Sequence, residues 1–125
     1  MLRVGMWCAA LVATTVATFI ILMPASMVPN SHFSNQDKIE HITATAILGC
    51  LWMLAVRRPL SVIVGGICYG ISTELLQKWM ALGRTCDPMD ALADTTGTVI
   101  GVIIVLAWAH HRRRRNHASL EDSAA

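Results

Sequence analysis

The stretch VGMWCAALVATTVATFIILM, residues 4–23, contains no charged side chain and decides the fold class. About 20 consecutive, predominantly apolar residues are what an α-helix needs to cross a hydrocarbon core about 30 Å thick. Three shorter apolar segments follow, and polar residues at one end extend each of them to a similar length. The sequence therefore predicts an all-α fold, a bundle of four transmembrane helices joined by short loops. We expect these helices at about 4–23, 38–56, 60–79 and 90–109.

The composition supports a membrane location. Hydrophobic residues make up 54% of the 125-residue chain and charged residues only 14%, and the mean hydropathy is +0.53. Soluble domains carry about 25% charged residues. A soluble four-helix bundle, the alternative, would need polar outer faces that these helices do not have.

The N-terminal segment also has some features of a secretory signal peptide, since Arg3 precedes its apolar run. The run is longer than the apolar region of about 7–15 residues typical of such peptides, and a clear A-x-A cleavage site is missing. We expect the first helix to be retained. The cysteines form no C-x-x-C pair and have no metal-ligand spacing; Cys86, in a polar loop, is the reactive candidate among Cys8, Cys50, Cys68 and Cys86.

The distribution of basic residues predicts that both termini are cytoplasmic (N-in/C-in). In this orientation the inner side carries seven Lys and Arg residues and the outer side three, as the positive-inside rule requires. Trp7, Trp52 and Trp108 then fall at the cytoplasmic ends of helices and Trp79 at the outer face, as interfacial anchors should.

The remaining ionisable residues then gather at the outer side of the membrane. Glu74 is the most demanding of them, because an ionised carboxylate inside an apolar helix costs several kcal/mol, on the order of magnitude, unless it is paired or neutralised. We predict a ligand-binding site formed by Asp37, Lys38, His41, Glu74, Gln77, Arg84, Asp90 and Asp94.

Residues spaced three or four apart share a helical face, and this spacing aligns the polar residues with small ones. Glycines at GxxxG spacing let helix backbones approach closely in lipid; they are Gly66, Gly70, Gly97 and Gly101. On each of these helices the small residues lie toward the cytoplasm and the polar residues toward the outside. We expect the helices to pack together through the small residues and to form an outward-facing pocket between the polar ones. Glu74 would there meet His41, Lys38 or Arg84. A simpler role remains open for Asp87 and Asp90, as acids at the start of a helix that Pro88 initiates.

The ordered set of these motifs resembles the VanZ-like family of small bacterial membrane proteins. Its elements are Asp37-Lys38-x-x-His41, Glu74-x-x-Gln77, Gly83-Arg84 and Asp90-x-x-x-Asp94-x-x-Gly97-x-x-x-Gly101. The resemblance covers roughly residues 36–105. Two departures concern the ligand: residue 94 is aspartate where the family usually has asparagine, and the aromatic residues that often follow the histidine are absent. The domain organisation implied is a first transmembrane helix with an extracytoplasmic loop (1–35), a VanZ-like three-helix core (36–109) and a basic cytoplasmic tail (110–125).

The resemblance implies a multi-pass protein of the bacterial cytoplasmic (inner) membrane. The family's namesake is associated with resistance to teicoplanin, a lipid-tailed glycopeptide, by a route separate from rebuilding the peptidoglycan target. We expect a protein that binds or modulates an amphiphilic cell-envelope molecule or a lipid-linked precursor, with Arg84, Lys38 and His41 contacting an anionic head. Membrane lipids and a second copy of the chain are further expected partners. No cofactor, metal ion or nucleic acid is expected.

Several alternatives stay open at the level of the sequence. One is an intramembrane enzyme acting on a lipid-linked substrate through His41, Glu74 and Asp90 as acid and base, with a metal-assisted version that adds Asp94. Another is a proton- or ion-coupled transporter, but four helices are few for a transporter, so the protein would need to oligomerise. The polar residues could also only hold helices together through hydrogen bonds worth about 0.6 to 2 kcal/mol each. The four arginines of the tail are expected to attract anionic lipid at about 1 kcal/mol each, and the rest of the tail to be disordered.

Overall fold

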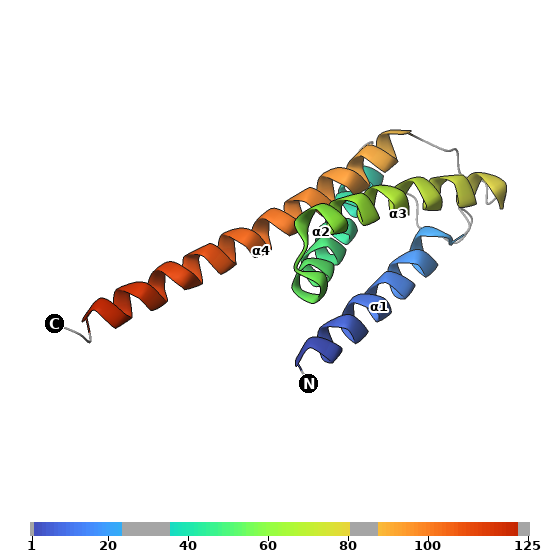
Figure 1. Cartoon of the computed structure of the whole chain (residues 1–125). Coiled ribbons are helices and arrows are strands. Elements are labelled where there is room, and N and C mark those ends of the chain that lie inside the picture. The colour runs from blue at the N-terminus through green and yellow to red at the C-terminus, as the bar shows by residue number, and fades with distance from the viewer. Residues whose placement is uncertain (1, 24–35, 81–87, 123–125) are drawn as a thin grey trace.

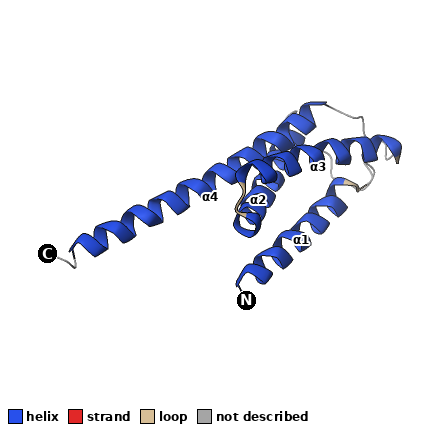
Figure 2. Cartoon of the chain, in the orientation of Figure 1, coloured by secondary structure: helices blue, strands red, loops and turns tan. Residues whose placement is uncertain are grey.

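The computed structural model describes residues 2–23, 36–80 and 88–122. It contains four helices: α1 (Leu2–Ile21), α2 (Gln36–Val56), α3 (Pro59–Trp79) and α4 (Pro88–Asp122). Each is long and apolar enough to cross a membrane. Within the ranges described the chain has no strand (Figure 2). The prediction of an all-α fold with four membrane-spanning helices is confirmed, and the N-in/C-in orientation stays a prediction.

Helix boundaries follow local chemistry. The turn between α2 and α3 has two residues, Arg57 and Arg58. Arg57 has a φ of 59°, the left-handed conformation that often closes a helix, and its N–H donates to the Met53 carbonyl at 3.0 Å. Pro59 then begins α3, where its fixed φ suits the first helical turn and its missing N–H leaves no donor unsatisfied. Pro88 begins α4 in the same way.

The helices α2, α3 and α4 pack as one group, and α1 lies beside it (Figure 1). The most extensive contact is between α2 and α4, followed by α3 with α4, while α1 packs mainly on α2. Side-chain hydrogen bonds also hold α1 to the group. Trp52 Nε1 donates to Thr14 Oγ1 at 3.0 Å, and the hydroxyls of Thr18 and Tyr69 lie 3.0 Å apart.

Helix α4 is much longer than the sequence predicted. It has 35 residues, so at 1.5 Å per residue it is about 52 Å long, against a hydrocarbon core about 30 Å thick. Its C-terminal half projects past the other helices (Figure 1). The expected helix end at residue 109 and the expected disorder of residues 116–122 are therefore wrong. The physical reason is that residues 102–122 contain no Gly or Pro, and Arg and Ala favour helix.

The bundle places large apolar side chains outside and small or polar ones inside. Phe19, Leu60 and Trp79 are 73%, 74% and 82% exposed, as lipid-facing residues of a membrane protein should be. The fully buried apolar core is small, with Met53, Val62 and Val102 at its centre. Since lipid solvates the outer surface, the interior is the place where polar groups can find partners.

Candidate functional site

Buried polar side chains mark where α2, α3 and α4 face one another. They are His41, Thr45, Thr73, Glu74, Gln77, Asp90, Asp94 and Thr98. Neighbouring apolar residues on the same helices, such as Ile39, Leu75 and Leu92, are exposed. The helices are therefore rotated so that their ionisable residues face the interior of the bundle and not the lipid. Ionisable residues in membrane proteins normally face the bundle interior.

The centre of this polar region is a hydrogen bond between His41 of α2 and Asp94 of α4. His41 Nδ1 lies 2.9 Å from Asp94 Oδ1, and the two side chains are 5% and 0% exposed. In the tautomer with the proton on Nδ1, His41 donates to the carboxylate, which accepts hydrogen bonds when ionised. Asp94 also faces α3, because a Cβ added to Gly70 would lie 3.0 Å from Asp94 Cβ. Three helices thus meet at this one carboxylate.

A second contact joins the same two helices nearer to their N-terminal ends. Lys38 Nζ lies 3.5 Å from Asp90 Oδ1, and its side chain is 34% exposed. Asp37, His41 and Asp90 each offer an oxygen or nitrogen atom within 4.8 Å of those of the other two. Asp90 of α4 is 53 and 49 positions away from Asp37 and His41 of α2, and all three belong to the predicted ligand-binding site.

Two predicted site residues lie on α3. Gln77 is buried, and its Nε2 donates to the Ile21 carbonyl of α1 at 2.7 Å. This contact satisfies one of the carbonyls that a helix C-terminus leaves without an intrahelical partner, so Gln77 has a structural role. Glu74 is also buried, 3% exposed. That Glu74 meets His41, Lys38 or Arg84 stays a prediction.

Three residues singled out in the sequence fall outside the described ranges. They are Arg84, Cys86 and Asp87. The roles expected for Arg84 in binding, for Cys86 as a reactive thiol and for Asp87 at the start of α4 therefore stay predictions.

The four predicted packing glycines lie against other helices. A Cβ at Gly97 would collide with the Ile42 carbonyl and Thr45 of α2, and one at Gly101 with the Ala46 carbonyl. A Cβ at Gly66 would lie 2.5 Å from Thr98 Oγ1 of α4. A Cβ at Gly49 of α2 would lie 2.7 Å from the Thr98 carbonyl oxygen. These contacts allow the close approach of α4 to α2 and α3.

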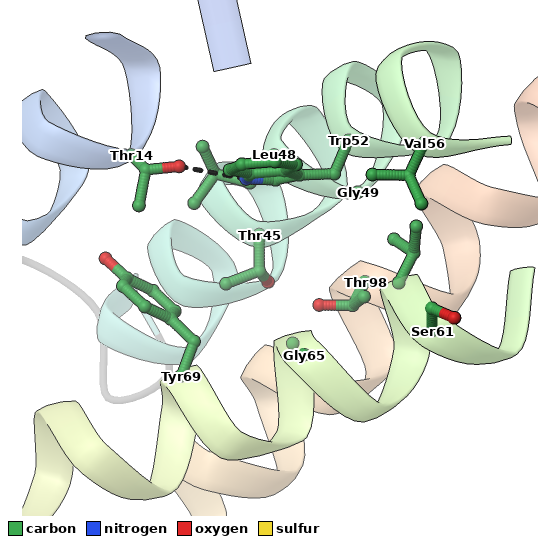
Figure 3. A pocket seen from close by; sticks show the side chains of 12 residues that line it. Thr14, Thr45, Leu48, Gly49, Trp52, Val56, Ser61, Gly65, Tyr69 and Thr98 are labelled. Carbon is green, nitrogen blue, oxygen red and sulfur yellow. Dashed lines mark hydrogen bonds between the residues drawn. The ribbon is translucent and has the colours of Figure 1, made fainter. Parts of the chain in front are cut away.

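A pocket of about 360 Å³ lies between α1 and the three-helix group. Thr14 of α1, Trp52 of α2, Tyr69 of α3 and Thr98 of α4 line it (Figure 3). The indole of Trp52 reaches across to Thr14, while the Tyr69 hydroxyl points toward α1 (Figure 3). Trp52 was predicted as an interfacial anchor; it contacts Trp7 edge-to-face, with ring centroids 5.4 Å apart, and also serves helix packing.

A second, open cleft of about 850 Å³ lies between α1 and α2. Its α1 wall is entirely apolar and runs from Ala9 to Ile21. On the α2 side, Asp37, Glu40 and His41 line the part nearest the start of the helix. Our sequence reasoning treated α1 only as a membrane span and missed its part in both spaces. The hydroxyls of Thr14 and Thr18, one turn apart in an apolar helix, were the signal that could have shown it.

Together these features define an integral membrane protein of four helices with an ionisable interior. A model of the VanZ/LLP1 family matches residues 6–109, and the chain belongs to that family. The match includes most of α1, beyond the residues 36–105 in which the motifs were recognised. No curated protein and no solved structure matches the chain.

Proposed function

We propose that this protein binds an amphiphilic molecule of the bacterial cell envelope in the cleft between α1 and α2. The observation that carries the proposal is the composition of the cleft walls. Apolar side chains of α1 and α2 form most of the lining, and ionisable side chains occupy the part where α2 begins. Ligand sites are typically apolar clefts with a few placed polar groups. A wall that follows α1 from Ala9 to Ile21, about 18 Å of helix, suits an acyl chain.

The polar part of the cleft favours a head group that donates hydrogen bonds or carries positive charge. Two of its three ionisable residues are the carboxylates Asp37 and Glu40. We revise the head-group contacts expected from the sequence, which placed Lys38, His41 and Arg84 on an anionic head. Lys38 contacts Asp90 and His41 contacts Asp94. Both side chains therefore already interact with acids of α4, which weakens their interaction with an anionic head group.

The experiment tests the cleft with two matched substitutions on α1. Ala17 lines the cleft, whereas Leu11 is exposed and not part of its lining. Wild type, Ala17→Trp and Leu11→Trp are expressed at equal membrane levels in a single-membrane bacterium. Susceptibility is measured to teicoplanin, which has a lipid tail, and to vancomycin, which lacks one.

We expect wild type and Leu11→Trp to protect selectively against teicoplanin, and Ala17→Trp to lose this protection because the indole fills the cleft. Purified protein should show the same order in thermal unfolding with added teicoplanin, since a ligand at 100 times its Kd stabilises the native state by about 2.7 kcal/mol. Equal protection by both variants would argue against the cleft. No protection by wild type would remove lipoglycopeptides from the candidate ligands.

One observation favours a second candidate, an enzyme acting on a lipid-linked substrate. His41 lines the cleft and is held by Asp94, which resembles a general base oriented by an acid. The orienting acid would be Asp94. In this enzyme His41 would activate a water molecule as the nucleophile. His41→Gln separates the two functions, because an enzyme loses turnover while ligand binding persists.

A further inference from the structure

The region where α2 and α4 begin brings together three side chains that can ligate a metal ion. Asp37 and His41 lie one turn apart on α2, and Asp90 lies in the first turn of α4. One donor atom from each lies within 4.8 Å of the other two. Donor atoms bound to one ion, at about 2.0–2.2 Å from it, lie closer together than this limit. Asp37 is only half-buried, so it can make the small adjustment needed.

The orientation of His41 is an independent observation that points to a ligand. When the Nδ1–H group of His41 donates a hydrogen bond to Asp94 Oδ1 at 2.9 Å, the lone pair of Nε2 is available to bind a metal ion. Metal-ligating histidines usually donate their second ring nitrogen to a carboxylate in this manner. Asp94 is completely buried, and its Oδ2 has no hydrogen-bond partner within the described part of the chain. A fully buried carboxylate that has an oxygen without a hydrogen bond is stabilised by a positive charge nearby.

Lys38 contributes a positive charge at the same place. Its Nζ lies 3.5 Å from Asp90 Oδ1. The Lys38 side chain is about one-third exposed and sits at the end of the helix, where a membrane-spanning segment meets water. An incoming ion would therefore reach Asp90 from the aqueous side and compete with the ammonium group for the carboxylate.

We propose that Asp37, His41 and Asp90 bind a divalent metal ion, with Asp94 as the residue that orients His41. One imidazole and two carboxylates form a mixed nitrogen and oxygen donor set, which suits Zn²⁺ or Mn²⁺. When the ion is absent, Lys38 compensates Asp90. This proposal departs from our sequence-based expectation that the protein holds no metal.

A simpler explanation exists for the two aspartates taken singly. Acids in the first turn of a helix interact favourably with its dipole by about 0.3–1 kcal/mol. That effect does not require two such acids from different helices to lie within 4.8 Å of one histidine, nor that histidine to be held by a third carboxylate. The two explanations differ in what they predict for metal affinity.

The test uses the full-length protein, purified in detergent, stripped with a chelator and titrated with MnCl₂. Free Mn²⁺ is followed by electron paramagnetic resonance, and ZnCl₂ is added as competitor. Asp37→Asn removes one ligand at a half-buried position. Glu40→Gln is the matched control, because Glu40 is an acid one residue before His41 that does not belong to the group of three. Unfolding temperatures without metal check that all variants are folded.

We expect one Mn²⁺ per wild-type chain, displaced by Zn²⁺, and an affinity reduced at least tenfold in Asp37→Asn, since even changes beyond the direct ligands cost about 10–100-fold. Glu40→Gln should bind as wild type does. Lys38→Gln should bind more tightly, because it removes the competing ammonium group, whereas a purely structural Lys38–Asp90 pair predicts no gain. Equal affinities of wild type and Asp37→Asn, or equal losses in Asp37→Asn and Glu40→Gln, would overturn the proposal. Asp37 and His41 also line the cleft, but no envelope amphiphile is added in this test, so metal binding can be found or refuted whether or not the proposed function holds.

Discussion

The imidazole of His41 and the carboxylate of Asp94 form a buried hydrogen bond of 2.9 Å that joins α2 to α4. Each residue is also tied to its own helix one turn further on. Thr45 Oγ1 donates to the His41 carbonyl at 2.7 Å, and Thr98 Oγ1 donates to the Asp94 carbonyl at 2.9 Å. The bond therefore belongs to a closely packed polar layer between the two helices, and its removal should affect the whole bundle.

Substitutions at Asp94 test whether this bond needs a charge or only an acceptor. Asp94→Asn keeps a side-chain oxygen for His41 Nδ1, so we expect a small change in stability. Asp94→Leu leaves the buried imidazole without its acceptor and should destabilise the protein by about 1–3 kcal/mol more. Thermal unfolding in detergent measures both, with Thr96→Val at an exposed position as control. Equal stability of Asp94→Leu and wild type would contradict this role.

Two glycines in comparable membrane-spanning positions should respond in opposite ways to alanine. A Cβ at Gly101 collides with the Ala46 carbonyl, a backbone atom that cannot move aside, whereas nothing lies within 4 Å of a Cβ at Gly65. Gly101→Ala should lower the unfolding temperature and the yield of folded protein. Gly65→Ala should be neutral or stabilising, by about 0.5–1 kcal/mol from helix propensity. The prediction fails if the two variants behave alike.

The contact between Thr18 and Tyr69 should show a small positive coupling between α1 and α3. A double-mutant cycle with Thr18→Val and Tyr69→Phe measures it from free energies of unfolding. We expect about 0.6 kcal/mol, the average for hydrogen bonds between transmembrane helices. Thr18 and Thr15 both donate to carbonyls of their own helix, but the Tyr69 hydroxyl lies beside Thr18, so a cycle that pairs Thr15→Val with Tyr69→Phe should give zero coupling. A Thr18 cycle that also gives zero would mean that this hydrogen bond does not hold α1.

Arg57 offers a substitution that should stabilise the protein. Its left-handed backbone, with φ at 59°, costs about 1–2 kcal/mol for a residue with a Cβ, and glycine adopts it freely. Arg57→Gly should therefore raise the unfolding temperature. Arg58 has an extended backbone with φ at −124°, so Arg58→Gly removes the same charge without relieving strain and should not stabilise. A gain in both variants would instead indicate relief of charge repulsion.

The orientation of the chain can be tested at its C-terminus. Arg112 to Arg115 lie on the projecting part of α4 and are exposed, and the positive-inside rule places them in the cytoplasm. Green fluorescent protein fused after residue 125 should fluoresce, and alkaline phosphatase at the same position should be inactive. Replacing the four arginines with glutamine should weaken this preference. An active phosphatase fusion of the wild-type chain would reverse the predicted topology.

The sequence by itself determined the number and type of the helices and the class of environment. A charge-free apolar segment long enough to span a membrane forms a helix, because in lipid its backbone N–H and C=O groups must hydrogen-bond within the segment. Helical periodicity also placed His41, Glu74, Asp90 and Asp94 on faces together with small residues. The structure has each of these four buried.

Only the tertiary structure decided which of these residues meet. Periodicity fixes the face of one helix, but the rotation and the relative height of two helices decide the pairing of His41 with Asp94 and of Lys38 with Asp90. A GxxxG motif indicates that a helix can approach another closely and leaves open which one; here Gly97 and Gly101 approach α2. The same limit hid the cleft along α1, and it left open that Asp37, His41 and Asp90 of the predicted site lie within 4.8 Å of one another.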